Sequence, residues 1–345
     1  MATFGPLTPA TEIAAAFPDA IHGKNIIITG VSPNSLGLAT ACAFASQSPA
    51  NLILTGRSID KLQASINILQ TSHPNITYHA LIMDLASQSS VRAAATQLLT
   101  NPTIPTIDIL INNAGVMAIP TLTLTEDNIE TTFATNHLGH FLFTNLILPK
   151  VILASKTSSH PRIINLTSYG HQFSPVRFSD INFSKLPTDL PENEQPDFTK
   201  TEFLTGSTHA TDLYYGFFSY AQSKTANILY SISLNQKLYT KYGITSYAVH
   251  PGAVDTNINR HATPSEIEQA LKRVEELGFD AVRKSPEQGA NSGWGCGYCW
   301  GGGEGVYIVD CKVDDENVAE FARKVVLSER LWGLSEELVK ERFEF

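Results

Sequence analysis

The chain has 345 residues, 43% of them hydrophobic, which is enough to build one large α/β domain or two smaller domains. A formal net charge of -9 and a pI of about 5.6 exclude the basic surface that replaces the counterions of a polyanion, so we expect no nucleic-acid partner. Four cysteines are too few and too unevenly spaced for a disulfide framework, which favours a reducing compartment.

The N-terminal segment lacks the pattern of a secretory signal. Residues 1–25 contain three prolines and two acids in place of a basic region followed by an uninterrupted apolar stretch. We also expect no run elsewhere to be long and apolar enough to span a bilayer. The chain is therefore predicted to be cytoplasmic, with no integral membrane segment.

Short apolar runs alternate with helical patterns along the chain. The runs are apolar on both faces, as strands of a parallel sheet covered by helices must be; they lie at 24–30, 51–56, 77–83, 107–111, 162–166, 244–249 and 305–309. Between them we expect a helix after residue 35, one capped by Ser87 and ending at Leu99, and two long helices at 136–152 and 214–242. The pattern predicts a single α/β domain over 1–345, a Rossmann-type doubly wound parallel sheet of about seven strands flanked by helices.

Two segments interrupt this alternation. Residues 174–211 carry four prolines and many acids, and we interpret them as an insertion within the domain. Residues 289–305 are rich in glycine and have no clear period. The aromatic residues in and around the insertion either line an apolar substrate pocket or pin the insertion to the body: Phe173, Phe178, Phe183, Phe198, Phe203, Tyr214, Tyr215, Phe217 and Phe218.

The first candidate site is the turn between the first predicted strand and helix, Thr29-Gly30-Val31-Ser32-Pro33-Asn34-Ser35-Leu36-Gly37. Glycines there permit positive φ, and backbone N–H groups at the helix N-terminus can hold a pyrophosphate. A structural turn that binds no ligand is the alternative interpretation.

Arg57 lies twenty residues beyond Gly37, at the end of the second predicted strand. A dinucleotide fold discriminates the adenosine ribose at this place: an acid accepts from the 2′-OH of NAD, whereas an arginine neutralises the 2′-phosphate of NADP. The next acid is Asp60, so NADP is favoured. The alternative is a solvated surface arginine.

Tyr220 and Lys224 stand four residues apart in a predicted helix and therefore lie on one face of it. An ammonium group beside a phenol favours the phenolate and lowers the pKa of the tyrosine towards working pH. Such a tyrosine can give a proton to an alkoxide or take one from an alcohol. An ordinary helix with an exposed lysine is the alternative.

Together these motifs resemble the short-chain dehydrogenase/reductase family over about 23–256, with a looser likeness to about residue 337. The branch that the chain resembles most is that of the retinol dehydrogenases and WW-domain oxidoreductases, especially the fungal members. The resemblance rests on the glycine-rich turn and on further motifs in family order: Asp84-Leu85, Asn112-Asn113-Ala114-Gly115, Thr135-Asn136-His137, Asn165-Leu166-Thr167-Ser168, Tyr220 with Lys224, and Pro251-Gly252-Ala253-Val254-Asp255-Thr256.

The resemblance implies an NADP(H)-dependent oxidoreductase that interconverts an alcohol and a carbonyl by hydride transfer. Tyr220 would be the general acid/base, and Ser168 would hydrogen-bond the substrate oxygen. Lys224 would bind the nicotinamide ribose and lower the pKa of Tyr220, and Asn136 would hold a water that links Lys224 to solvent. The implied cofactor-binding residues are Gly30, Ser32, Ser35, Leu36, Gly37, Arg57, Asp84, Leu85, Asn113, Ala114, Gly115, Tyr220, Lys224, Pro251, Gly252, Val254 and Thr256.

Three features depart from the family pattern. The turn has one extra residue after Gly30, with Ser35 in the place of the middle glycine, so we expect an altered loop geometry. The segment between Ser168 and Tyr220 is unusually long, and residues 291–303 are glycine-rich where relatives have an apolar helix. Cys296 and Cys299 in that stretch lack a second ligand pair, so no metal is expected.

Two functions therefore stay open from the sequence. The first is the NADP(H)-dependent enzyme acting on a small carbonyl or alcohol, for which an apolar substrate is open, with 256–300 as its substrate-loop region. The second is a non-catalytic NADP-binding regulatory or scaffold protein, which the altered turn and the glycine-rich stretch suggest. An oligomer is compatible with either function.

Overall fold

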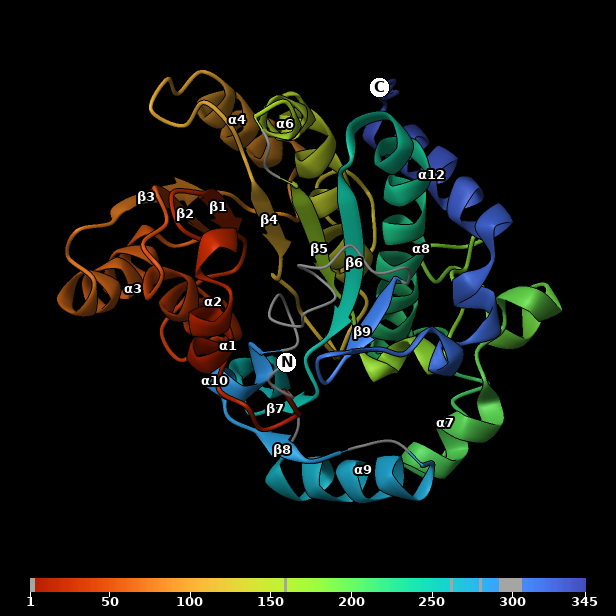
Figure 1. Ribbon diagram of the computed structural model, residues 1–345. Coiled ribbons are helices and arrows are strands. Elements are labelled where there is room, and N and C mark those ends of the chain that lie inside the picture. Colours follow the sequence, from red (N-terminus) through yellow and green to blue (C-terminus); the bar gives the residue numbers. More distant parts are fainter. Residues whose placement is uncertain (1–3, 158–159, 261–262, 279–280, 292–305) are drawn as a thin grey trace.

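The computed structural model describes residues 4–157, 160–260, 263–278, 281–291 and 306–345. Within them, an eight-stranded sheet has the order β10-β9-β6-β5-β4-β1-β2-β3 (Figure 1). The predicted doubly wound parallel sheet is confirmed, with eight strands where about seven were expected. The strands of this sheet are β1 (Asn25–Ile28), β2 (Asn51–Gly56), β3 (Thr77–Ile82), β4 (Ile109–Asn112), β5 (Arg162–Leu166), β6 (Thr245–His250), β9 (Tyr307–Val309) and β10 (Lys312–Val313).

Within the large sheet, the strand that the sequence did not predict is β10, at one edge. It pairs antiparallel with β9, whereas the other neighbouring strands of this sheet pair in parallel. Asp310 and Cys311 connect the two strands with φ angles of 50° and 64°, as in a two-residue hairpin turn. A strand of two residues is too short to show a period in the sequence. A separate small sheet pairs β7 (Ala253–Val254) with β8 (Arg283–Lys284).

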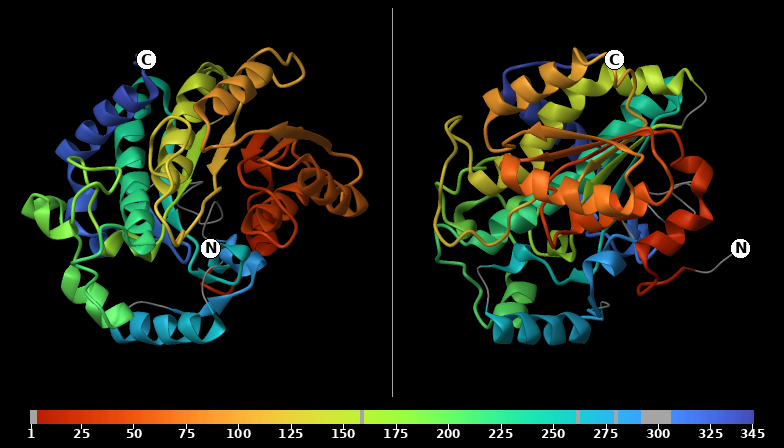
Figure 2. Two further views of the ribbon diagram at one scale, coloured as in Figure 1. Left: turned by 180° about the vertical axis from the view of Figure 1, so that it is seen from behind. Right: turned by 90° about the vertical axis from the view of Figure 1, so that its left-hand side faces the viewer.

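Helices cover both faces of the large sheet (Figures 1 and 2). One face packs against α4 (Gln88–Leu99), α6 (Gly139–Ser155), α8 (Gly216–Tyr242) and α12 (Val325–Val339). The other face packs against α1 (Ala10–Ala16), α2 (Leu36–Ala45) and α3 (Ile59–Ser72). Further short helices are α5 (Thr131–Phe133), α7 (Phe198–Thr205), α9 (Pro264–Glu276) and α10 (Pro286–Gly289). Ser87 caps α4 as predicted, by accepting from the backbone N–H of Ser90.

The helix predicted from residue 136 begins earlier and is not regular. α5 is followed by a π-helical turn over Ala134–Leu138 and then by α6. The stretch Thr131–Ser155 is long and apolar enough to cross a membrane, which the sequence analysis did not recognise, but 72% of its most apolar window is buried inside the fold. Here it serves as a core helix against the sheet. π turns occur often at functional sites.

The predicted insertion, 174–211, is anchored by a buried ion pair. Arg177 donates to the carboxylate of Asp180 and to the main-chain oxygen of Lys185, and its guanidinium lies 4.0 Å from the ring centroid of Phe183. Both charged side chains are almost fully buried. Beyond this anchor the insertion continues into α7, which packs against α9 at the outer rim of the molecule (Figure 1). The glycine-rich stretch with Cys296 and Cys299 lies outside the described residues.

The buried ion pair predicts a large effect of Arg177→Leu on stability. The substitution leaves the buried carboxylate of Asp180 without its cation, so we expect the free energy of unfolding to fall by about 3 kcal/mol in urea titrations. Lys200→Ala, which removes an exposed partner of Asp197 in the same insertion, should change it by less than about 1 kcal/mol. Equal losses in the two variants would contradict the anchoring role of Arg177.

Candidate active site

The site lies where the carboxyl ends of the parallel strands meet. The strand order reverses between β1 and β4, and in open α/β sheets ligands bind at such a switch point. A cavity of about 880 Å³ opens there, lined by residues that follow or end each of β1 to β6. All predicted cofactor-binding residues line it except Gly37 and Lys224: Gly30, Ser32, Ser35, Leu36, Arg57, Asp84, Leu85, Asn113, Ala114, Gly115, Tyr220, Pro251, Gly252, Val254 and Thr256.

The turn after β1 has no room for a side chain at its first glycine. Gly30 has a φ of +72°, and a Cβ there would lie 2.7 Å from the Cα of Ala114. Ser35 caps α2 by accepting from the backbone N–H groups of Leu38 and Ser32, at 3.1 and 3.2 Å. Asn34 is left-handed at φ 59°, which accommodates the extra residue. The loop thus keeps a close backbone approach, and Ser35 takes over the helix-capping task.

Positive charge gathers at one end of this cavity. Arg57, Ser58 and Lys61 line it from the end of β2 and the start of α3, and Arg260 lines it as well. Asp84 is the only acid among the described lining residues. Sequence reasoning missed Lys61, although it stands one helical turn beyond Arg57, and missed Arg260, for which the sequence held no signal. This charge pattern fits a phosphate group.

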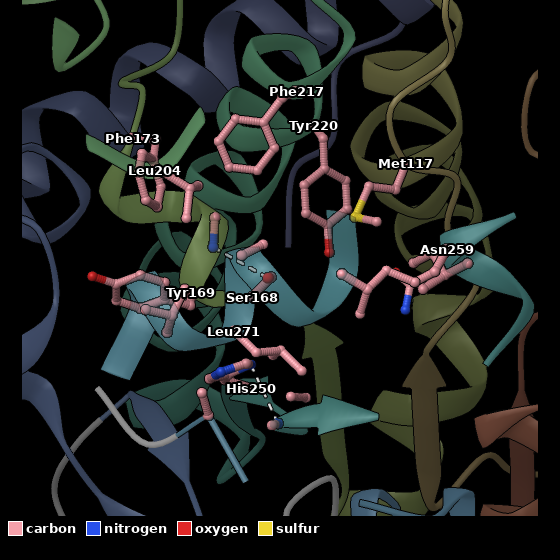
Figure 3. A pocket seen from close by; sticks show the side chains of 18 of the residues that line it. Met117, Ser168, Tyr169, Phe173, Leu204, Phe217, Tyr220, His250, Asn259 and Leu271 are labelled. Atoms are coloured by element: carbon pink, nitrogen blue, oxygen red, sulfur yellow. Dashed lines mark hydrogen bonds between the residues drawn. The ribbon is translucent and has the colours of Figure 1, made fainter. Parts of the chain in front are cut away.

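Tyr220 and Ser168 lie at the junction of two cavities. Both line the first cavity and a second one of about 990 Å³, where Figure 3 shows the Tyr220 side chain directed into the space beside Met117. Ser168 follows β5, and its Oγ accepts from the backbone N–H of Gly170 at 3.1 Å. A Cβ on Gly170 would lie 3.1 Å from the Tyr220 ring, so a glycine that the sequence analysis overlooked allows this close packing.

Burial shifts the two expected proton-handling groups in opposite directions. Burial raises the pKa of Tyr220 to about 12, although a hydrogen bond with Ser168 lowers it in part. Burial lowers the pKa of Lys224 to about 7. The expectation that Lys224 brings the pKa of Tyr220 towards working pH is therefore wrong for the cofactor-free protein, because desolvation of the phenol outweighs any stabilisation of its anion.

Lys224 sits behind the cavity wall rather than on it. Its Nζ lies 5.3 Å from the Tyr220 ring centroid and donates to the main-chain oxygen of Leu166 at 2.9 Å. Asn227 donates to the same oxygen at 2.8 Å. These bonds fix α8 against the end of β5, and with it the position of Tyr220.

Asn136 lies in the π turn and is fully engaged with protein groups. Its Oδ1 accepts from the N–H of Val116 at 2.8 Å, and its Nδ2 donates to the main-chain oxygen of Val116 and to Ser223 Oγ, at 2.9 and 3.0 Å. Its side-chain amide thus holds the loop after β4, and its role towards a water stays a prediction. This loop separates the two cavities, since Val116 lines the first and Met117 the second.

The second cavity is walled largely by apolar and aromatic side chains (Figure 3). α9 supplies Ile267, Leu271 and Val274 to its outer wall. Seven of the nine aromatic residues around the insertion divide between the two interpretations, and Phe198 and Phe203 do neither, since Phe203 is exposed. Those that line the cavity are Phe173, Tyr214, Tyr215 and Phe217; those that pack into the body instead are Phe178, Phe183 and Phe218.

His250 lines both cavities and was missed by sequence reasoning, although it directly precedes Pro251-Gly252. Burial, with the nearby positive charge of Lys284, lowers its pKa to about 3, so the imidazole is neutral. The buried ammonium of Lys284 pairs with Asp310 and packs over Gly252, where a Cβ would lie 2.6 Å from Nζ. The β7–β8 sheet and the β9–β10 hairpin therefore meet at the loop that borders both cavities.

Comparisons with known proteins agree with this arrangement. The sequence pattern of short chain dehydrogenases matches residues 24–179. Oxidoreductase fscI of Fusarium equiseti is 38% identical over 72% of this chain and 94% of its own length, and retinol dehydrogenase 12 of Bos taurus is 32% identical over 94% and 89%. The structure of L-sorbose reductase from Gluconobacter frateurii complexed with NADPH and L-sorbose superposes with a TM-score of 0.54, at 18% identity, over 79% of this chain and 88% of that one.

The pKa of Lys224 predicts how stability depends on pH. Because the folded chain releases this proton near pH 7 and the unfolded chain only near 10.5, the unfolded state binds more protons between these values. The free energy of unfolding of the cofactor-free protein should therefore rise with pH, by about 1 kcal/mol per unit above pH 8, through this group alone. Urea titrations of wild type and Lys224→Met measure this slope.

Lys224→Met should lose the slope, and Lys237→Met, which removes an exposed lysine of the same helix, should keep it. Identical slopes in wild type and Lys224→Met would mean that Lys224 remains charged in the folded chain.

Proposed function

Because the chain belongs to the short-chain dehydrogenase/reductase family, in its retinol-dehydrogenase-like branch, we propose that it is an NADP(H)-dependent oxidoreductase with Tyr220 as general acid/base. It would interconvert an alcohol and a carbonyl. The observation that carries this proposal is that Tyr220 and Ser168 border both a dinucleotide-sized cavity and a separate apolar one. A substrate oxygen in the second cavity can thus reach the phenol beside the first.

The protein's own groups would hold the substrate and move a proton. When bound, the cofactor supplies or takes up the hydride. The hydroxyl groups of Ser168 and Tyr220 would both hydrogen-bond the substrate oxygen. In reduction the phenol gives its proton to that oxygen, and a pKa of about 12 keeps the phenol protonated at neutral pH. In oxidation the phenol must first lose its proton, so we expect that direction to become faster as pH rises.

The preference for NADP(H) rests on the charges at one end of the first cavity. Arg57 and Lys61 stand at the end of β2 and the start of α3, where the 2′-phosphate of an adenosine ribose would lie, and Arg260 is a third cation in the lining. Gly30 and the N-terminus of α2 would receive the pyrophosphate. L-sorbose reductase, which shares the fold, binds NADPH.

The second cavity favours a sizeable apolar carbonyl or alcohol as substrate. Its volume and its aromatic walls suit burial of an apolar body, with the reacting oxygen at Ser168 and Tyr220. We assign the described part of the region 256–300 to substrate binding, because α9 supplies residues to the outer wall; residues 292–300 lie outside the described residues. The non-catalytic scaffold alternative gains no support from a tyrosine that faces both cavities.

Tyr220→Phe should abolish turnover while leaving cofactor binding intact. The ring remains and only the transferable proton is lost, so kcat should fall by about 10² to 10⁴ with the NADPH dissociation constant nearly unchanged. NADPH oxidation with a panel of aldehydes and ketones, and fluorescence titration of NADPH, measure the two quantities. Tyr230→Phe, buried in the same helix outside both cavities, is the control and should retain turnover. Turnover in Tyr220→Phe equal to that of wild type would refute the role.

Arg57→Ala should weaken NADPH binding selectively. Loss of charge-assisted hydrogen bonds to the 2′-phosphate should raise the NADPH dissociation constant by about tenfold to a hundredfold and leave that of NADH unchanged. Arg323→Ala, an exposed arginine that lines neither cavity, should affect neither constant. Equal affinity of the wild-type chain for NADPH and NADH would overturn the NADP assignment.

A further inference from the structure

One buried histidine connects the floor of the cofactor cavity to Asn136. His140 lies in the first turn of α6, is 2% exposed and lines neither cavity. Its Nε2 is 2.8 Å from Oγ1 of Thr29, and its Nδ1 is 3.2 Å from the main-chain oxygen of Asn136. The imidazole therefore bridges the end of β1 and the π turn, two segments that border the site from different sides.

The Thr29 end of this bridge holds two backbone amides in place. Thr29 Oγ1 accepts from the N–H groups of Asn113 and Ala114, at 2.9 and 3.0 Å. Both residues line the first cavity. A movement of the Thr29 hydroxyl would therefore move the cavity wall at the end of β4.

The Asn136 end leads to the helix that carries Tyr220. Asn136 donates to Ser223 Oγ, which donates in turn to the main-chain oxygen of Tyr220 at 2.7 Å. The same asparagine holds both backbone groups of Val116. The bonds thus run without a gap from the cofactor cavity, through His140, to the backbone of Tyr220.

The donors and acceptors around His140 determine which of its ring nitrogens carries the proton. A main-chain oxygen only accepts, so Nδ1 must carry the proton that reaches Asn136. Burial lowers the pKa of His140 to about 4, which leaves Nε2 as an acceptor at neutral pH. The Thr29 hydroxyl then donates to Nε2 at 2.8 Å in preference to the main-chain oxygen of Ile111, which lies farther away at 3.4 Å, and its oxygen keeps two lone pairs for the amides of Asn113 and Ala114. In this one arrangement every donor faces an acceptor.

We propose that His140, as the neutral Nδ1–H tautomer, is a positioning residue that holds the cofactor-cavity amides and Asn136 in one fixed relation. The role rests on the proposed function, because it matters only where a dinucleotide and Tyr220 must be aligned. In a buried polar network of this kind, a displacement of one group moves its partners as well, because each buried group must keep its hydrogen bonds.

Two amide variants separate the two ends of the bridge. His140→Asn places an N–H near the Nδ1 position and cannot reach Thr29, whereas His140→Gln places an amide oxygen near the Nε2 position and abandons Asn136. We expect the NADPH dissociation constant to rise about three- to tenfold in His140→Asn, the effect of one lost hydrogen bond, with kcat at saturating NADPH nearly unchanged. In His140→Gln we expect the reverse: a lower kcat with a nearly unchanged NADPH dissociation constant. His140→Phe should both raise the NADPH dissociation constant and lower kcat.

His137 provides the matched control. It lies three residues earlier, is equally buried and bonds to Ser335 of α12 at 2.9 Å, away from both cavities. His137→Gln should lower stability without changing the NADPH dissociation constant or kcat. Effects of the His140 variants no larger than those of His137→Gln would overturn the proposal.

A spectroscopic measurement tests the same role without turnover. In ¹⁵N spectra of histidine-labelled protein at pH 7, His140 should show the Nδ1–H tautomer, assigned by the signals that vanish in His140→Gln. An Nε2–H tautomer or an imidazolium would overturn the proposal. If the wild-type chain turned over no carbonyl, the proposed function would fail, while the tautomer and the NADPH affinities would still decide the role of His140.

Discussion

Burial of the polar face of α8 is the constraint on which the site depends. Tyr220, Ser223, Lys224 and Asn227 are each at most 6% exposed, and a buried polar group without a partner destabilises a fold. Lys224 and Asn227 both donate hydrogen bonds to the main-chain oxygen of Leu166, the last residue of β5. Ser223 accepts a hydrogen bond from Asn136. These hydrogen bonds therefore allow only one position of the helix on the sheet. In that position Tyr220 lies beside Ser168, where the two cavities join.

The same burial explains why the pKa of Tyr220 differs from the one that its spacing from Lys224 suggests. A lysine one helical turn from a tyrosine is expected to stabilise the phenolate, yet both groups lie in a low-dielectric interior that disfavours either charge. The phenol therefore holds its proton and the ammonium releases its own more easily. In the cofactor-free chain the phenol of Tyr220 is therefore neutral at neutral pH, which is the state that a proton donor to a carbonyl needs.

Much of the fold was accessible from the sequence, because runs apolar on both faces identify buried parallel strands and polar caps such as Ser87 identify helix starts. The spacing of motifs also located most of the cofactor cavity, since residues after parallel strands converge on one edge. Features that depend on tertiary contacts were not accessible: the strand β10, the π turn beneath Asn136, Arg260 in the lining, and the division of the aromatic residues between cavity and core. The pKa of Tyr220 belongs to this group, because sequence spacing gives proximity and does not give burial.

The packing of Lys284 over Gly252 limits how this protein can diverge. Gly252 has a φ of +86° and lies beneath a buried ammonium whose partner, Asp310, belongs to a different hairpin. A side chain at 252 would displace that ammonium, and loss of either charge would strand the other in the interior. A change at any one of these three positions is therefore expected to require a compensating change at the others.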